Sequence, residues 1–305
     1  MPMKSGSGRV WAWWSGRAEH MSSPTDPEAT EVDERTDGVR TKPPPEALVG
    51  TVFDGRFQIQ GIIGQGGAGT VYRALQQSLA RPVALKISWL DSDAQGSEAT
   101  RFLREASLAG SLQHPNVVTV HDFGRTGEGA CYMVMELLEG VSLRTVMGGE
   151  AMDVRRALGL FDQILGGLRH AHQAGLIHRD MKPGNVQVMR TDEGQERIKI
   201  LDFGLVRRAR DEETELRAGT FVGTPHYAAP EQVRGLPADP RSDLYSVGVM
   251  LYRALTGCLP FVGPTPLAIA SAQVRKDYPD MARRAPGVEV HSQLEAVVRK
   301  AMHKA

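Results

Sequence analysis

The sequence predicts an α+β protein in which a small lobe rich in β-strands precedes a larger lobe made mostly of helices. Between residues 57 and 137, short runs alternate apolar and polar residues, which is the period of half-buried strands, and one segment among them has helical spacing. After Gly140 the apolar residues recur mainly at helical spacing. At 305 residues, the chain is long enough to bury a core in one large domain or two smaller ones.

The composition argues against several classes of protein. Lys and Arg together number 36, as do Asp and Glu, so the formal net charge is zero and nothing favours a nucleic acid or a membrane surface as a partner. Cys131 and Cys258 lie far apart and match no zinc or redox spacing, which favours a reducing, cytoplasmic compartment. No apolar run approaches the roughly 20 residues that span a bilayer, so we expect no membrane span in this chain.

Residues 1–52 are expected to form a disordered N-terminal extension. Pro, Ser, Thr, Asp and Glu dominate from Ser22 to Pro45, and such segments bury too little apolar surface to fold. The tryptophans between residues 11 and 14 are compatible with a short docking motif. The alternative is that translation starts at Met21 and that the residues before it are not made. Both interpretations stay open at this point.

A glycine-rich turn joins the first two strands of the small lobe. Residues 64–69 have the Gly-x-Gly-x-x-Gly spacing, which dinucleotide-binding folds also use, but there a helix begins at the loop. Here residues 70–75 continue as a second strand, which predicts a β-hairpin whose backbone N–H groups can lie over phosphates. The third strand, at residues 83–87, carries a single lysine. Lys86 is either an edge residue or a phosphate ligand, and the preceding glycine turn favours the ligand.

The next segment, from Glu98 to Gln113, has the spacing of an amphipathic helix, and an acidic residue falls inside its apolar stripe. A carboxylate on a buried helix face needs a cation. We therefore expect Glu105 to pair with Lys86 of the neighbouring strand. The alternative is that Glu105 lies at the edge of the stripe and is solvated.

Two more strands and two long helices complete the predicted elements. Residues 117–123 and 130–137 are predicted strands joined by a turn. Residues 153–174 and 242–256 have strongly apolar helical patterns. The buried side of the first of these helices is expected to consist of Leu158, Phe161, Ile164, Leu165 and Leu168.

The stretch at residues 178–204 organises the rest of the chain. His-Arg-Asp-Met-Lys-Pro-Gly-Asn at 178–185 is followed, after a short apolar hairpin, by Asp-Phe-Gly at 202–204. The polar groups stand at the ends of buried segments, where a charge is costly unless it is paired or binds a metal. Phosphoryl transfer needs such a set: a carboxylate for the hydroxyl proton, a cation for the phosphoryl group and oxygen ligands for Mg²⁺. The alternative, for any one of these tripeptides alone, is a turn rich in Asp, Asn, Gly and Pro.

Taken in this order, the segments resemble the motifs of the eukaryotic-like (Hanks-type) serine/threonine protein kinases of bacteria. The resemblance covers residues 53–305 and implies the two-lobed protein kinase fold, with an N-lobe at about 53–138 and a C-lobe at about 139–305. It implies transfer of the γ-phosphate of Mg-ATP to Ser or Thr hydroxyls of proteins, autophosphorylation of the activation loop and a signalling role. The alternative function is a nucleotide-binding pseudokinase or scaffold. A small-molecule kinase is disfavoured by the Ala-Pro-Glu segment.

The resemblance also assigns roles to single residues. The implied catalytic residues are Lys86, Glu105, Asp180 and Lys182, with Asp180 as the base and Lys182 facing the transferred phosphoryl group. The implied Mg²⁺ ligands are Asn185 and Asp202. ATP is expected to bind between the lobes and to contact the glycine-rich turn, the adjoining strands, the connection between the lobes and one strand below it. These residues are Ile63, Gly64, Gln65, Gly66, Gly67, Ala68, Gly69, Thr70, Val71, Ala84, Lys86, Met135, Glu136, Leu138 and Gln187.

After Asp-Phe-Gly the chain resembles an activation segment that ends in Ala-Pro-Glu at residues 229–231. Thr220 matches the activating phosphosite, and Arg179 is expected to clamp its phosphate. Glu231 is the expected anchor of the segment. Residues 178–185 correspond to the catalytic loop of the family. Asp243, near the start of the helix at 242–256, is either a helix cap or the anchor of the catalytic-loop backbone. A transient homodimer is expected for autophosphorylation.

Two departures from the family pattern carry expectations of their own. Gln187 stands where an apolar residue usually packs beneath adenine, so it either weakens nucleotide stacking or adds a hydrogen bond. The family would continue past residue 305 into a helix with an arginine partner for Glu231, so we expect a truncated C-lobe. Losing one member of a buried ion pair costs about 3–5 kcal/mol.

Overall fold

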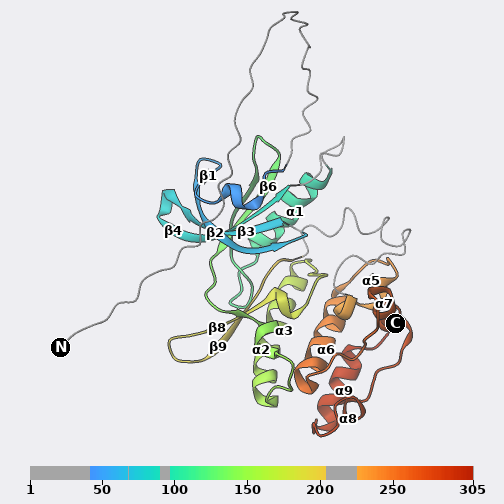
Figure 1. The fold of residues 1–305 in the computed structure, drawn as a ribbon. Coiled ribbons are helices and arrows are strands. Elements are labelled where there is room, and N and C mark those ends of the chain that lie inside the picture. The colour runs from blue at the N-terminus through green and yellow to red at the C-terminus, as the bar shows by residue number, and fades with distance from the viewer. Residues whose placement is uncertain (1–41, 68, 90–96, 204–224, 305) are drawn as a thin grey trace, which may run out of the picture. The chain divides into compact units, whose positions relative to one another are not determined.

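The computed structural model describes residues 42–67, 69–89, 97–203 and 225–304. Figure 1 shows a lobe of antiparallel strands with the helix α1 beside it, and a second lobe dominated by helices. The predicted α+β, two-lobed class is therefore confirmed. The expectations for residues 1–41, Ala68 and Thr220 lie outside the described residues. In the described part of the chain, no helix is both long and apolar enough to cross a membrane.

The small lobe is a six-stranded antiparallel sheet with the strand order β1-β2-β3-β4-β6-β5. Its strands are β1 (Val52–Phe53), β2 (Phe57–Gly66), β3 (Gly69–Gln76), β4 (Arg81–Trp89), β5 (Val120–Arg125) and β6 (Ala130–Glu136). The lobe also contains α1 (Ser97–Ser111) and the short 3-10 helices η1 (Pro45–Leu48) and η2 (Gln77–Leu79). β4 and β6 lie in the interior of the sheet and are buried along most of their length, which explains their continuous apolar sequences.

The folded part begins earlier than the sequence predicts. Residues 42–52 belong to the small lobe, although the sequence predicts disorder up to residue 52. The Tyr72 hydroxyl donates a hydrogen bond to the Pro45 carbonyl over 3.1 Å, and Leu48 packs against the core of the sheet. Phe53, in β1, is itself part of that core. A prediction from composition averages over a segment, so it misses a few apolar residues that pack against a core.

The large lobe is built around α6 (Pro240–Thr256), most of whose side chains are buried. Asp239 caps the N-terminus of this helix, and Gly257, at φ 72°, ends it in the left-handed conformation that favours glycine. The other helices are α2 (Leu143–Met147), α3 (Val154–Gln173), α5 (Pro230–Val233), α7 (Pro266–Arg275), α8 (Met281–Arg284) and α9 (Ser292–Ala301), with the 3-10 helices η3 (Pro183–Asn185) and η4 (Pro225–Tyr227). A second sheet consists of β7 (Val141–Ser142), β8 (Val186–Arg190) and β9 (Glu196–Ile200).

The helix α3 forms as predicted, but its buried side is rotated. Phe161, Ile164 and Leu168 are buried as expected, whereas Leu158 and Leu165 are 44% and 42% exposed. The two exposed leucines lie seven residues apart and therefore share one line along the helix, next to the buried stripe. Apolar spacing alone does not tell which of these two adjacent rows of side chains faces the core.

The loop before β5 attaches the small lobe to the large one. Residues 117–119 are predicted as strand, but β5 starts at Val120, and Val117 instead forms an isolated parallel bridge with Ile200 of β9. Asn116 Nδ2 donates to the Ile198 carbonyl over 3.1 Å, and the Ile200 N–H donates to the Asn116 carbonyl over 2.9 Å. This loop is therefore hydrogen-bonded to β9 of the large lobe, next to the segment that carries Asp202.

Candidate active site

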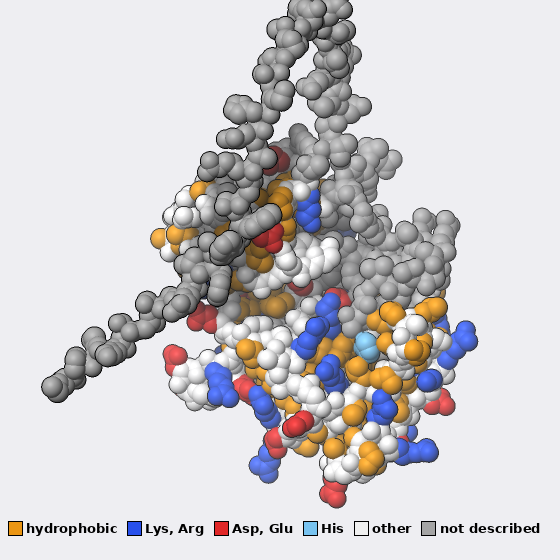
Figure 2. Space-filling view, viewed as in Figure 1, with side chains coloured by type: hydrophobic (Ala, Val, Ile, Leu, Met, Phe, Trp, Pro, Cys, Tyr) orange, Lys and Arg blue, Asp and Glu red, His pale blue; other side chains and the backbone are white. Residues whose placement is uncertain are grey.

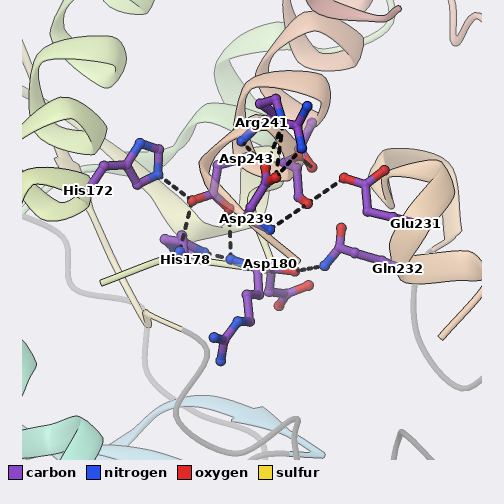
Figure 3. A network of polar contacts seen from close by, with 11 residues as sticks. His172, His178, Asp180, Glu231, Gln232, Asp239, Arg241 and Asp243 are labelled. Atoms are coloured by element: carbon purple, nitrogen blue, oxygen red, sulfur yellow. Dashed lines mark hydrogen bonds and ion pairs between the residues drawn. The ribbon is translucent and has the colours of Figure 1, made fainter. Parts of the chain in front are cut away.

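A buried aspartate holds the backbone that carries the expected catalytic residues. The Asp243 carboxylate, 1% exposed, accepts hydrogen bonds from the backbone N–H groups of His178 and Arg179, each over 2.8 Å. His172 Nε2, from α3, lies 2.7 Å from the same carboxylate (Figure 3). Because Asp239 is the cap of α6, the structure places Asp243 in the anchoring role and not in the capping role. These hydrogen bonds offset the cost of burying a carboxylate.

The backbone turns sharply at Arg179. Its φ is 64°, in the left-handed region that a non-glycine residue occupies only at a cost of about 1–3 kcal/mol. The turn is held on its N–H side by Asp243 and on its carbonyl side by Gln232 of α5, whose Nε2 donates to the Arg179 carbonyl over 2.7 Å. Figure 3 shows Gln232 reaching toward this loop from α5. Hydrogen bonds on both sides of Arg179 therefore hold this strained backbone in place. The turn sets the direction of the chain at Asp180.

Asp180, Lys182 and Asn185 form one cluster. Lys182 Nζ lies 2.6 Å from Asp180 Oδ2, and Asn185 Nδ2 donates to the same oxygen over 3.1 Å and to the Asp180 carbonyl over 2.8 Å. The Asp180 side chain remains 20% exposed, so a substrate hydroxyl can reach the carboxylate. Because the Asn185 nitrogen faces Asp180, its amide oxygen is left for another ligand.

Asp202 is joined to this cluster through backbone and ring contacts. The Leu201 N–H donates to the Asn185 carbonyl over 2.8 Å, and His178 Nε2 lies 2.8 Å from the Leu201 carbonyl. The ring of His178, which is fully buried, packs on Phe203 with centroids 4.9 Å apart. Asp202 itself has a left-handed backbone, φ 46°. The catalytic loop and the segment around Asp202 are therefore fixed to one another.

The donor set fits a hard divalent cation. Asn185 and Asp202 offer an amide oxygen and a carboxylate, the oxygen ligands that Mg²⁺ prefers. Among the described residues, no group of three or more His, Cys, Asp or Glu side chains could hold a metal by itself. A site with so few protein ligands is of the kind in which Mg²⁺ keeps water and phosphate oxygens as its remaining ligands.

Lys86 does not make the pair that the sequence predicts. Its side chain is buried, and its Nζ lies 2.7 Å from Asp202 Oδ1. Glu105 Oε1 instead lies 3.9 Å from Arg179 Nη1. The expected Lys86–Glu105 ion pair is thus not formed between these described residues. Two carboxylates compete for one buried ammonium group, and the structure places Asp202 beside it.

The glycine-rich turn forms the predicted β-hairpin. β2 and β3 pair up to Gly66 and Gly69, and Val71 of β3 stands opposite Lys86 in the neighbouring ladder. Gly69 has φ 127°, and an added Cβ would lie 2.4 Å from the Ile87 carbonyl oxygen, so only glycine fits there. The remaining expected ATP contacts of this hairpin are at its edge and tip, with Thr70 buried and Ile63, Gly64, Gln65 and Gly67 at least partly exposed.

The connection between the lobes continues from β6. Met135 is buried and stands opposite Ala84 of β4. The Glu136 carboxylate lies 2.6 Å from Lys199 Nζ and accepts from the Thr119 N–H over 2.7 Å. Although burial acts to raise it, the hydrogen bonds from Lys199 and the Thr119 backbone bring the pKa of Glu136 below its ordinary value. No pattern in the sequence marked Lys199 as the partner of Glu136.

The two remaining residues of the expected ATP site are Leu138, in this connection, and Gln187, in β8. Leu138 follows β6 and is half-buried. Gln187 of β8 is half-buried and stands opposite Lys199 in the β8–β9 ladder and opposite Ser142 in the β7–β8 ladder. Both residues therefore lie next to the segment that joins the lobes.

The segment around Ala-Pro-Glu is held by side chains of the large lobe. Gln273, fully buried on α7, donates to the carbonyls of Pro225 and His226 and accepts from the Tyr245 hydroxyl over 2.5 Å. Ser246 donates to the Tyr227 carbonyl over 2.7 Å. No motif marks Gln273. The available signal was a polar residue inside the apolar stripe of a short helix.

Glu231, the expected anchor, lies on α5 and accepts a hydrogen bond from the hydroxyl of Ser242, the third residue of α6 (Figure 3). The adjacent Gln232 completes the link to the catalytic loop. These two contacts join α5, α6 and the catalytic loop, and no sequence motif marked the roles of Ser242 and Gln232.

Comparisons with known proteins agree with this geometry. The family model of the protein kinase domain matches residues 57–303. The serine/threonine-protein kinase pkn2 of Myxococcus xanthus is 41% identical over 262 residues, and the match covers 85% of this chain and 31% of that protein. The serine/threonine-protein kinase PknL of Mycobacterium tuberculosis is 42% identical over 246 residues, covering 80% of this chain and 60% of PknL.

The fold gives the same result. The crystal structure of the PknI kinase domain of Mycobacterium tuberculosis superposes with a TM-score of 0.63 at 25% identity, covering 84% of this chain and 91% of that one. The curated relatives are much longer than the region matched here, as the shares of 31% and 60% indicate.

Proposed function

The chain belongs to the protein kinase domain family, and from this we propose that it is an ATP-dependent serine/threonine protein kinase. The observation that supports this proposal is that Lys86 of the small lobe lies 2.7 Å from Asp202, while the Leu201 N–H next to Asp202 donates to the Asn185 carbonyl and Asn185 contacts Asp180. Polar groups from three chain segments, β4, residues 178–185 and the segment around Asp202, meet there, where phosphoryl transfer would need them. Family membership implies ATP and a divalent metal ion, and we propose Mg²⁺ as that ion on the strength of the oxygen donors described above.

Within this proposal, the roles divide as follows. Asp180 accepts the proton of the substrate hydroxyl, since its carboxylate is partly exposed and fixed by Asn185. Lys182 stabilises the charge on the transferred phosphoryl group, and Lys86 binds the phosphates of ATP. Asn185 and Asp202 hold the metal ion, which when bound neutralises charge on the phosphates. The chain itself contributes mainly positioning and electrostatics.

We also propose the substrates, a phosphosite, the cellular compartment and the mode of autophosphorylation. The substrates are Ser and Thr residues of proteins, Thr220 is an autophosphorylation site, and Arg179 binds its phosphate. The kinase acts in the cytoplasm and dimerises transiently for autophosphorylation. The support is the family of the chain and, for Arg179, its position between the catalytic loop and Glu105.

The test is phosphate incorporation from γ-labelled ATP in the presence of Mg²⁺. We expect the wild-type chain to label itself and a generic protein substrate, and Asp180→Asn to reduce the rate by roughly 100-fold or more, since general-base and positioning contributions of this size are typical. Asp192→Asn, an exposed residue in the turn between β8 and β9, serves as the matched control and should retain the wild-type rate. Equal incorporation by wild type and Asp180→Asn would contradict the proposal.

One observation favours a second candidate, a nucleotide-binding pseudokinase. In this arrangement Lys86 lies against Asp202, and the amide of Gln187 lies among the residues expected to contact ATP. Such a protein would gain thermal stability from ATP by mass action but transfer no phosphate. A thermal-shift titration beside the labelling assay separates the two: stabilisation with incorporation supports the kinase, and stabilisation without incorporation supports the pseudokinase.

A further inference from the structure

Two arginine side chains, one beside the catalytic loop and one beside Tyr227, have no acidic partner among the described residues. Arg144 lies on α2 and Arg253 on α6. Within the described residues neither makes an ion pair. Glu139 and Glu150, the acidic residues that flank α2 in the sequence, pair with neither arginine in this part of the chain. Both guanidinium groups therefore keep their full charge available to a ligand.

The guanidinium of Arg144 lies against the catalytic loop itself. A Cβ added to Gly184 would stand 3.1 Å from Nη2 and 3.6 Å from Cζ of Arg144. Gly184 stands between Lys182 and Asn185 in the sequence, so this charge lies next to the residues that surround Asp180. The lack of a side chain at Gly184 leaves room for the planar group to approach the loop.

Arg253 lies at the other end of α2. Its Nη1 is 2.7 Å from the Tyr227 hydroxyl of η4, and its Nη2 donates to the Gly148 carbonyl over 3.2 Å. Gly148 ends α2, so four residues, or roughly 6 Å of helix rise, separate it from Arg144. The two arginines thus lie at opposite ends of α2, with Arg144 beside the catalytic loop and Arg253 beside Tyr227. Two of the five donors of Arg253 are used, which leaves others for a ligand.

The nearby imidazole of His226 favours its neutral form. Burial first, and then Arg253, lower the pKa of His226. Figure 2 shows Lys and Arg side chains on the middle of this face of the large lobe, over α6, among hydrophobic side chains.

We propose that Arg144 and Arg253 form a subsite for a negatively charged side chain of the protein substrate, close in sequence to the residue that is phosphorylated. The proposal rests on the kinase function proposed above. An extended peptide advances about 3.3 Å per residue, so a residue a few positions from the hydroxyl at Asp180 can reach Gly184, which adjoins Asn185 beside Asp180. A carboxylate or phosphate matches the planar fork of a guanidinium, whereas Lys or Arg at that place is repelled.

The chain provides the sequence for a probe. In residues 209–218, Thr214 stands between Glu213 and Glu215, and Asp211 and Glu212 precede them. A synthetic peptide with this sequence is the acidic substrate. A second peptide carries Gln at all the acidic positions, a third carries phosphoserine in place of Glu213, and a fourth carries Lys at the acidic positions.

Steady-state kinetics of the full chain test the subsite. We expect wild type to phosphorylate the acidic peptide with a kcat/KM roughly tenfold above that for the Gln peptide, the size typical of hydrogen bonds to charged groups. Arg144→Gln should lose this ratio through the KM of the peptide, with the KM of ATP unchanged. Arg144→Glu should reverse it in favour of the Lys peptide. A rate for the phosphoserine peptide above or below that of the acidic peptide assigns phosphate or carboxylate as the better ligand.

Arg283→Gln is the control, because Arg283 is exposed on α8 and has the same charge as Arg144. It should keep the wild-type ratio. A wild-type enzyme without preference for the acidic or phosphoserine peptide, or an Arg144→Gln enzyme that keeps the preference, overturns the subsite and leaves the kinase function standing. Failure of every variant to label any peptide or protein contradicts the kinase function and the subsite with it.

Discussion

The two halves of the candidate site differ in how their charged groups are held. In the large lobe, the catalytic-loop backbone is fixed by Asp243, which several groups contact from α3 and from the loop itself, and by Gln232 from α5. In the small lobe, Lys86 Nζ contacts Asp202 Oδ1 over 2.7 Å, and Glu105 lies beside Arg179.

This difference separates a fixed scaffold from charges that can exchange partners. A buried carboxylate with several directional donors has one good arrangement, because any other leaves polar groups unsatisfied. Lys86, by contrast, contacts one carboxylate among the described residues, and another anionic oxygen can replace that single contact. We therefore expect substitutions in the scaffold to change folding stability and catalysis together, and substitutions on the small-lobe side to change mainly catalysis.

The largest effect is expected for Asp243→Ala. The change leaves the backbone N–H groups of His178 and Arg179 without their buried acceptor, which should lower the free energy of unfolding by about 3–5 kcal/mol and abolish activity. Urea denaturation and phosphate incorporation measure the two effects. Asp239→Ala, which removes the cap of the same helix, is the control and should cost about 1 kcal/mol. A loss for Asp243→Ala no larger than for the control would show that it does not anchor the loop.

Lys86→Met should separate catalysis from folding. Methionine fills the buried space without an ammonium group, and the Asp202 side chain is 35% exposed, so its carboxylate can be solvated. We expect the free energy of unfolding to change by less than about 1 kcal/mol, because replacing a buried charge by an apolar group of similar size is often neutral. Phosphate incorporation should fall by roughly 100-fold or more. Unfolding experiments in which Lys86→Met lost as much stability as Asp243→Ala would remove the distinction between the two halves.

His172→Phe tests a positioning role within the scaffold. His172 contacts the Asp243 carboxylate, and its loss should cost about 1–2 kcal/mol of stability. A loosened catalytic loop should lower kcat while the KM of ATP stays constant. The control is His170→Phe, on the same helix, whose ring is partly exposed and stacks on His114. A rise in the KM of ATP with unchanged kcat would argue against the positioning role.

Lys199→Met should give the smallest effect, and one that depends on pH. The pKa of Glu136 is lowered in the folded protein, so this carboxylate contributes stability above its unfolded pKa of about 4.3, and the contribution is lost as the pH falls through the folded value. We expect the variant to be less stable than wild type by about 1 kcal/mol at pH 7, with the difference shrinking below about pH 4. Urea denaturation at several pH values measures it, and a difference that grew on acidification would contradict the assignment.

Much of the fold and of the site could be predicted because their signals are local. Alternating residues predicted the strands around Lys86, and the spacing of Asp180, Asn185 and Asp202 placed them at the ends of buried segments, where the structure has them together. The β-hairpin was predicted from the glycine spacing at residues 64–69 and the strand that follows it, and Gly69 has φ 127° at its turn.

The remainder depends on tertiary contacts that spacing does not report. The partner of Lys86 depends on which of two carboxylates lies nearer, and the role of Asp243 depends on Asp239 being the residue that caps α6. Gln273 and Lys199 make their hydrogen bonds to residues far away in the sequence, and no local pattern identifies those partners.

The central claim is that Lys86 from one lobe and Asn185 and Asp202 from the other converge on one metal-bound triphosphate. Isothermal titration of ATP into the full chain, with Mg²⁺ and with EDTA, tests it most directly. The account predicts that EDTA, Asp202→Asn and Lys86→Met each weaken binding by roughly tenfold or more, since each removes a charge-assisted contact to the phosphates. ATP binding with the same affinity in all of these experiments would contradict it.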